Sequence, residues 1–156
     1  MHRFRAVREG DWPEIALLAS NEVQEADHSG LEDLWLHSRR SFDGLRRHAV
    51  LELHGAIVGY CAIERREEDA LDTYRIFLVA SWDPENSEVH EELFARVEAM
   101  LREVGARRAW MRELRGDLEL IRFVGSRGFE VSAPYRVADK EMLILTKPYP
   151  VRGRGS

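Results

Sequence analysis

Residues 82–92 carry the side chains whose types and spacing most suggest a binding site, and most of these side chains are acidic. The segment reads Trp-Asp-Pro-Glu-Asn-Ser-Glu-Val-His-Glu-Glu and leads into a helix. The N–H groups at a helix start, together with the helix dipole, favour an anion such as phosphate by about 0.3–1 kcal/mol. One carboxylate within about 4 Å of that phosphate opposes it by roughly 1 kcal/mol in water and about 4 kcal/mol at an effective dielectric of 20. Two acids facing a phosphate would therefore outweigh the helix.

The acids leave two interpretations of this segment open. In one, the acids point to solvent and free backbone N–H groups hold a phosphate weakly. The candidate contact residues are then Trp82, Ser87, Val89 and His90. In the other, acids in the first helical turn stabilise their own helix, with Ser87 as its N-cap and His90 exposed to solvent. No Lys or Arg occurs in residues 76–95 to neutralise the acids.

Length and composition indicate one globular domain. The chain has 156 residues, of which 44% are hydrophobic and 33% charged, as is ordinary for soluble proteins. A formal net charge of −5 gives no electrostatic footprint for nucleic acid. No apolar run approaches the roughly 18–20 residues that span a membrane, and the N-terminus lacks the apolar region of a secretory signal. We therefore expect a cytoplasmic protein with neither nucleic acid nor membrane as partner, and a single cysteine, Cys61, in the core.

The hydrophobic pattern predicts a mixed α/β fold. The expected strands are residues 4–7, 48–53, 56–64, 73–79, 108–112, 130–137 and 140–146, and the expected helices begin near residues 11, 31, 87 and 120. His54 and Gly55 predict a tight hairpin turn. A meander followed by helical crossovers indicates a mixed central sheet of six to seven strands, flanked by about four helices. We expect one domain over residues 1–148 and a flexible tail over residues 149–156.

The helix beginning near residue 87 has a marked apolar face. Its members are Val89, Leu93, Val97, Met100, Leu101 and Val104. Because these positions recur at helical spacing, we expect this face to pack on the sheet.

This order of elements resembles the GNAT N-acetyltransferases over residues 3–147. Residues 52–60 are similar to the family's hairpin ending in Ile-Val-Gly, residues 82–85 stand where the family has Val-x-Pro-Glu, and residues 120–129 resemble its helix closing on Gly-Phe. The family's pyrophosphate loop reads Arg/Gln-x-x-Gly-x-Gly/Ala, whereas residues 87–92 here read Ser-Glu-Val-His-Glu-Glu. The resemblance therefore implies a GNAT-like domain with a degenerate loop, and acetyl-CoA as a weakly bound co-substrate without a metal.

The resemblance also bears on which residue protonates the thiolate that leaves when the thioester of acetyl-CoA reacts. Many GNAT enzymes place a Tyr four residues before the Gly of Gly-Phe to protonate the leaving thiolate, but that position here is Val124. Ser126 and Tyr135 are the nearby alternatives for this proton. If the enzyme lacks only that acid, Val124→Tyr would raise its turnover. Asp117 stands where the family usually has Asn near the co-substrate.

Two residues on the central strands are candidates for the general base that deprotonates the amine. Glu64 could play this part, or it could be a strand-end residue in water. Tyr74 could likewise act as the base, or it could be a packed aromatic residue.

Two functions follow from these residues. The first is an N-acetyltransferase acting on an amine of a small molecule or peptide. The alternative is a catalytically silent GNAT-like module that binds a ligand or a protein partner. The apolar late strands, residues 142–145, are compatible with a homodimer or with pairing to a second GNAT-like lobe.

Overall fold

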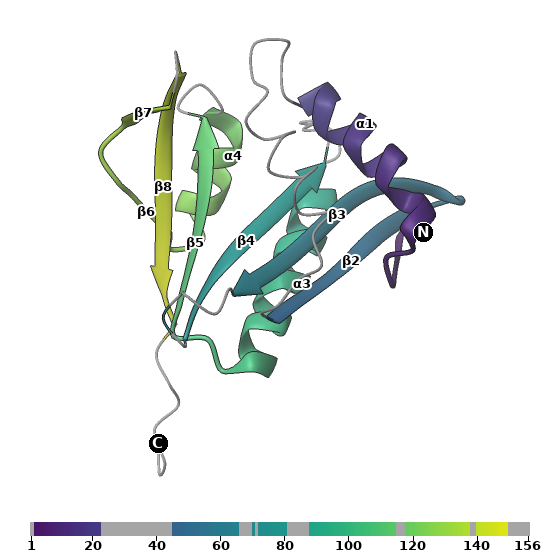
Figure 1. Cartoon of the computed structure of the whole chain (residues 1–156), viewed down its shortest axis with the longest axis horizontal. Helices are drawn as coiled ribbons and strands as arrows, with labels where there is room; N and C mark the ends of the chain where they lie inside the picture. The colour runs from purple at the N-terminus through teal and green to yellow at the C-terminus, as the bar shows by residue number, and fades with distance from the viewer. Residues whose placement is uncertain are drawn as a thin grey trace.

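A computed structural model shows a mixed sheet with helices on both faces, which confirms the predicted fold class (Figure 1). It describes residues 2–22, 45–65, 70, 72–80, 88–114, 118–137 and 140–149. The elements are β1 (His2–Arg5), η1 (Glu9–Asp11), α1 (Trp12–Glu22), β2 (Leu45–Leu53), β3 (Ala56–Arg65), β4 (Thr73–Ala80), α3 (Glu88–Val104), β5 (Arg108–Leu114), α4 (Leu118–Gly125), β6 (Glu130–Val131), β7 (Tyr135–Val137) and β8 (Lys140–Pro148). None of the described helices is long and apolar enough to cross a membrane.

The sheet has the strand order β1-β2-β3-β4-β5-β8-β6, with β7 also paired to β8. Strands β2 to β4 form the expected antiparallel meander, and β1 pairs antiparallel with β2. The predicted hairpin turn between β2 and β3 is confirmed, because both His54 (φ 51°) and Gly55 (φ 82°) adopt positive φ values. Two consecutive residues of this kind form the turn whose twist matches that of the flanking strands.

Strands β4 and β5 are parallel neighbours in the middle of the sheet, and they pair over only three positions. Thr73, Tyr74 and Arg75 of β4 pair with Arg108, Ala109 and Trp110 of β5. Both strands continue beyond this point, but their paths separate (Figure 1). Beyond these three pairs the sheet is therefore split between β4 and β5.

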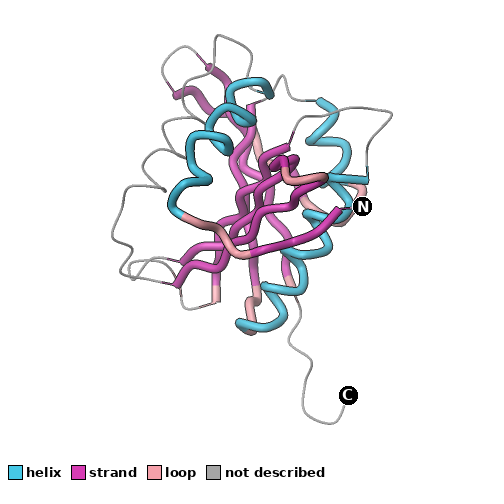
Figure 2. The backbone as a smooth tube through the Cα atoms, turned by 90° about the vertical axis from the view of Figure 1, so that its right-hand side faces the viewer, coloured by secondary structure: helices cyan, strands magenta, loops and turns pink. Residues whose placement is uncertain are grey.

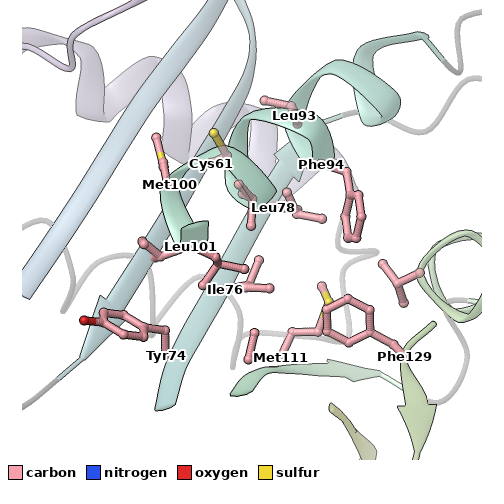
Figure 3. Packing of buried hydrophobic residues seen from close by; sticks show 14 of the residues in the cluster. Cys61, Tyr74, Ile76, Leu78, Leu93, Phe94, Met100, Leu101, Met111 and Phe129 are labelled. Carbon is pink, nitrogen blue, oxygen red and sulfur yellow. The ribbon is translucent and has the colours of Figure 1, made fainter. Parts of the chain in front are cut away.

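The two helices that follow β1 and β4 cover opposite faces of the sheet, which we call the α1 face and the α3 face (Figure 2). On the α1 face, Ile15 is fully buried with Val50, Tyr60 and Val79. On the α3 face, the predicted apolar side of α3 is confirmed. Val89, Leu93, Val97, Met100 and Leu101 are buried, and Val104 is partly buried, among strand residues that include Cys61, Ile76 and Leu78 (Figure 3).

Helix α3 ends at Val104, directly before a glycine. Gly105 has φ 70°, and the N–H of Ala106 donates to the carbonyl of Leu101 at 2.9 Å. Glycine is the residue best suited to this left-handed position, so the chain can turn directly into β5.

Two expectations about the elements need correction, and two others fall on residues that the structure does not describe. The sheet has eight strands rather than six or seven, because residues 130–137 form two short strands interrupted at Pro134, which has no N–H to donate. The first strand spans His2–Arg5 rather than residues 4–7. The helix expected from about residue 31 and residues 150–156 of the tail lie outside the described residues.

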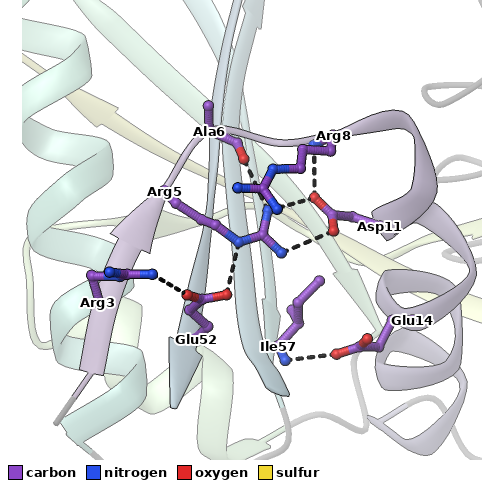
Figure 4. A network of polar contacts seen from close by, with 8 residues as sticks. All are labelled: Arg3, Arg5, Ala6, Arg8, Asp11, Glu14, Glu52 and Ile57. Atoms are coloured by element: carbon purple, nitrogen blue, oxygen red, sulfur yellow. Dashed lines mark hydrogen bonds and ion pairs between the residues drawn. The ribbon is translucent and has the colours of Figure 1, made fainter. Parts of the chain in front are cut away.

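A polar cluster joins β1 and β2 to the start of α1 (Figure 4). The guanidinium of Arg5 donates to both oxygens of Asp11, at 2.8 and 2.9 Å, and to Glu52 at 2.7 Å. Asp11 also accepts the backbone N–H of Arg8 at 2.7 Å. The carboxylate of Asp11, directly before α1, is thus engaged by Arg5 and by the turn before the helix.

Candidate functional site

The separation of β4 and β5 leaves backbone groups without ladder partners between the two strands, and a bound molecule could use them. Within the described residues, positions 76–80 of β4 have ladder partners on β3 alone, and positions 111–114 of β5 have them on β8 alone. Buried backbone N–H and C=O groups need partners. An extended chain containing amide groups could supply them by lying along β4 like an added strand.

Helix α3 brings its N-terminal turn toward the same end of the sheet, since it is the next described element after β4. The side chains of Val89 and His90 point inward, with 3% and 2% of their surface exposed. The ring of His90 packs edge-on against Phe123 at 6.0 Å. The solvent-exposed alternative for His90 is therefore wrong. Because these two side chains are buried, Val89 and His90 could contact a ligand only through their backbone N–H groups, whereas Glu88 and Glu91 of the same turn are exposed.

Basic side chains from distant parts of the chain lie beside the acids of this turn. A guanidinium nitrogen of Arg127, just after α4, is 3.3 Å from Glu91, and Nδ1 of His2 is 2.8 Å from Glu92. Arg127 also lies over the ring of Phe123, with 4.3 Å between its guanidinium carbon and the ring centroid. Because of Arg127, the turn is less negative than residues 76–95 alone indicate.

Comparison with known proteins gives a match through structure alone. No protein-family model and no curated protein matches the chain. Among solved structures, the ribosomal-protein-alanine N-acetyltransferase of Brucella melitensis is 19% identical with a TM-score of 0.72, covering 94% of this chain and 99% of that one. The ribosomal-protein-S18-alanine N-acetyltransferase of Escherichia coli is 15% identical with a TM-score of 0.73, covering 100% and 99%. A putative acetyltransferase from Salmonella typhimurium, solved with its cofactor acetyl-CoA, is 14% identical with a TM-score of 0.70, covering 98% and 96%.

The chain has the GNAT acetyltransferase fold. This confirms the resemblance drawn from the sequence, and the shared coverage extends over almost the whole of both chains. The candidate residues predicted from the sequence can now be located within this fold. Trp82, Ser87 and Asp117 lie outside the described residues, so their assignment to the co-substrate stays a prediction.

Glu64 lies on the α1 face of β3, and only 4% of its surface is exposed. One of its oxygens is 3.5 Å from a guanidinium nitrogen of Arg46 on the neighbouring strand β2. The alternative that placed Glu64 in water is therefore wrong. A buried carboxylate one strand away from β4 remains a candidate base.

Tyr74 lies on the other face, where it is 4% exposed and belongs to the same core cluster as Ile76 and Leu101 (Figure 3). This confirms the alternative in which Tyr74 is a packed aromatic residue. Ser126 is exposed in the turn after α4, and its hydroxyl donates to the carbonyl of Phe123 at 2.6 Å. In this arrangement the Ser126 proton is already engaged.

Val124 occupies the position where many GNAT enzymes have their acid, and it is completely buried. It belongs to the α3-face core together with Leu120 and Phe129. A tyrosine here would have to fit into a packed core before it could contact a ligand.

We therefore expect Val124→Tyr to destabilise the protein rather than to improve catalysis. Overpacking a buried site costs about 1–3 kcal/mol, and urea unfolding would measure this loss. Leu118→Tyr, at the exposed start of the same helix, is the matched control and should change stability by no more than about 0.5 kcal/mol. Equal stability of Val124→Tyr and wild type would show that the core has room for the ring.

Proposed function

We propose that this chain is an N-acetyltransferase that takes an acetyl group from acetyl-CoA and transfers it to an amine of a small molecule or peptide. The separation of β4 from β5 is the observation that carries the proposal. The pantetheine arm of acetyl-CoA is an extended chain with amide groups, which suits the edge of β4 from Ile76 to Ala80. The acetyl-CoA in the structure of the Salmonella typhimurium relative, which shares the fold, supports the same co-substrate.

The diphosphate of acetyl-CoA would lie near the first turn of α3, where the residues fit it less well. Glu88, Glu91 and Glu92 repel the diphosphate, while backbone N–H groups and the helix dipole attract it. Arg127 is the cation best placed to assist, because it already reaches Glu91 in this turn. We propose that Arg127 exchanges its contact with Glu91 for one with the diphosphate. Binding is then a competition between Glu91 and the ligand for one guanidinium.

Acetyl-CoA supplies an activated thioester, and the protein has to position the amine and remove its proton. The amine nitrogen forms a bond to the acetyl carbon, the carbon–sulfur bond breaks, and the sulfur takes a proton from water. Glu64 is our candidate to receive the amine proton through a water molecule. Most of the rate would then come from holding the reactants together in the correct geometry.

Calorimetric titration with acetyl-CoA tests this proposal. We expect weak binding to the wild type, about tenfold tighter binding to Glu91→Gln, and weaker binding to Arg127→Ala. A tenfold change corresponds to about 1.4 kcal/mol. Arg102→Ala removes an exposed arginine from the other end of α3 and should leave the affinity unchanged. Identical affinities in all four proteins would show that neither Glu91 nor Arg127 is close to the diphosphate.

Burial of Val124 favours a second candidate, a catalytically silent GNAT-like module. In that case acetyl-CoA or another ligand would bind without reacting. A thiol-release assay with a panel of amines separates the two functions. Binding together with amine-dependent thiol release supports the enzyme, whereas binding without release supports the module.

A further inference from the structure

Arg75 is the last residue of β4 that pairs with β5, so it lies where the two strands begin to separate. A row of paired residues crosses four strands at this level: Arg46 of β2, Glu64 of β3, Arg75 of β4 and Trp110 of β5. Glu64 faces an arginine on each neighbouring strand. Arg75 alternates with the α3-face residues Tyr74 and Ile76, so its side chain lies on the α1 face.

Two aromatic rings hold the guanidinium of Arg75 at this place. Its carbon is 4.4 Å from the ring centroid of Phe77 on the same strand and 5.2 Å from that of Trp110 on β5. Contacts of this kind engage the flat faces of a guanidinium. The N–H groups at its edge then remain directed for hydrogen bonds in its own plane. A guanidinium has five such donors, so one guanidinium can bind a protein group and a ligand carboxylate at the same time.

Which reactant contacts Arg75 depends on the face of the sheet from which each reactant binds. This step rests on the proposed function. On that proposal, the diphosphate lies at the first turn of α3, so the diphosphate and the pantetheine arm would reach the split from the side of α3. The amine must then approach the thioester from the opposite side, which is the α1 face. Arg112 of β5 lies on this face too, two residues beyond Trp110. The acceptor therefore meets guanidinium groups as it approaches.

We propose that the acceptor is an amine that also carries a carboxylate, and that Arg75 binds this carboxylate. A planar guanidinium fork matches a carboxylate through two parallel hydrogen bonds, a pairing that fixes orientation as well as affinity. Bound in this way, the acceptor is held with Glu64 beside it on the next strand. Amino acids are the simplest molecules of this class.

Matched acceptors test the inference in the thiol-release assay. Each acceptor is offered as a pair, an α-amino acid and its C-terminal amide, which differ only in the carboxylate. We expect wild type to use the free acids with at least tenfold higher kcat/KM, although the amides have the less basic and more readily deprotonated amine. Arg75→Gln should remove this preference by raising KM for the acids. Arg75→Lys, which keeps the charge but loses the planar fork, should retain part of it.

Controls separate a binding role for Arg75 from a structural one and from failure of the proposed function. Arg47→Gln removes an exposed arginine from the other face of β2 and should leave the acid preference intact. Acetyl-CoA affinity, measured by calorimetry, should be equal in wild type and Arg75→Gln. Failure of the wild type to bind acetyl-CoA would overturn both the function and the inference. If acetyl-CoA binds, the inference alone is overturned when amides serve as well as acids, when no amino acid is acetylated, or when Arg75→Gln slows both members of a pair equally.

Discussion

Leu93→Ala should lower the free energy of unfolding by about 2–5 kcal/mol, because it removes a fully buried side chain from the contact between α3 and β3. Gly59 of β3 lies directly beneath this side chain. A Cβ atom added to Gly59 would come within 2.8 Å of a Leu93 methyl carbon. Gly59→Ala should therefore cost about 1–3 kcal/mol by overpacking. Urea unfolding of each variant measures both losses.

The two substitutions should compensate for each other when they are combined. In the double variant, the alanine methyl at position 59 occupies part of the space that Leu93→Ala vacates. We expect the double variant to be more stable than the sum of the single losses predicts, by about 0.5–3 kcal/mol. Gly10→Ala is the control, since nothing lies within 4 Å of a Cβ there, and it should change stability by no more than about 1 kcal/mol. If the stability losses of the two single variants simply add, α3 can shift on β3 without a cost in free energy.

The Gly59–Leu93 contact also gives the glycine of the hairpin a physical role. Glycine at the end of the Ile-Val-Gly segment lets α3 approach the sheet closely, and α3 in turn brings its first turn toward the split between β4 and β5. A substitution far from any ligand could therefore weaken acetyl-CoA binding by moving this turn. Local sequence was sufficient to predict the hairpin and the apolar face of α3, because both depend on residues that are close along the chain.

Contacts between distant residues were beyond what the sequence could show. Arg127 and Glu91 are 36 positions apart, and their ion pair depends on how α4 packs beside α3. Burial of Glu64 depends on strand register, which sets it between arginines of two neighbouring strands. Position 124 aligned with a family tyrosine, but only the packing of α4 shows that it faces the core. The elements were thus predictable, whereas the charges and burial at the candidate site required the assembled sheet.

Arg5→Met should lower the melting temperature by several degrees, because it leaves the carboxylates of Asp11 and Glu52 without their shared partner (Figure 4). All three side chains are at most 16% exposed, so water compensates poorly for the lost hydrogen bonds. Arg3→Met is the matched control. Arg3 also donates to Glu52, at 2.8 Å, but its side chain is 74% exposed. Exposed ion pairs contribute little, so we expect Arg3→Met to shift the midpoint by no more than about 3 °C.

The same cluster predicts how stability depends on pH. Hydrogen bonds from Arg5 hold the pKa of Asp11 below its usual value, and those from Arg5 and then Arg3 lower the pKa of Glu52. A carboxyl group whose pKa is lower in the folded state contributes its full stability above the unfolded pKa, about 3.9 for Asp and 4.3 for Glu, and loses it as pH falls further toward the folded value. Wild type should therefore lose stability more steeply than Arg5→Met does as the pH falls below about 4, and the two proteins should converge in acid. Parallel curves of melting temperature against pH would mean that Arg5 stabilises the fold by packing alone, and the ionic account of this cluster would then be wrong.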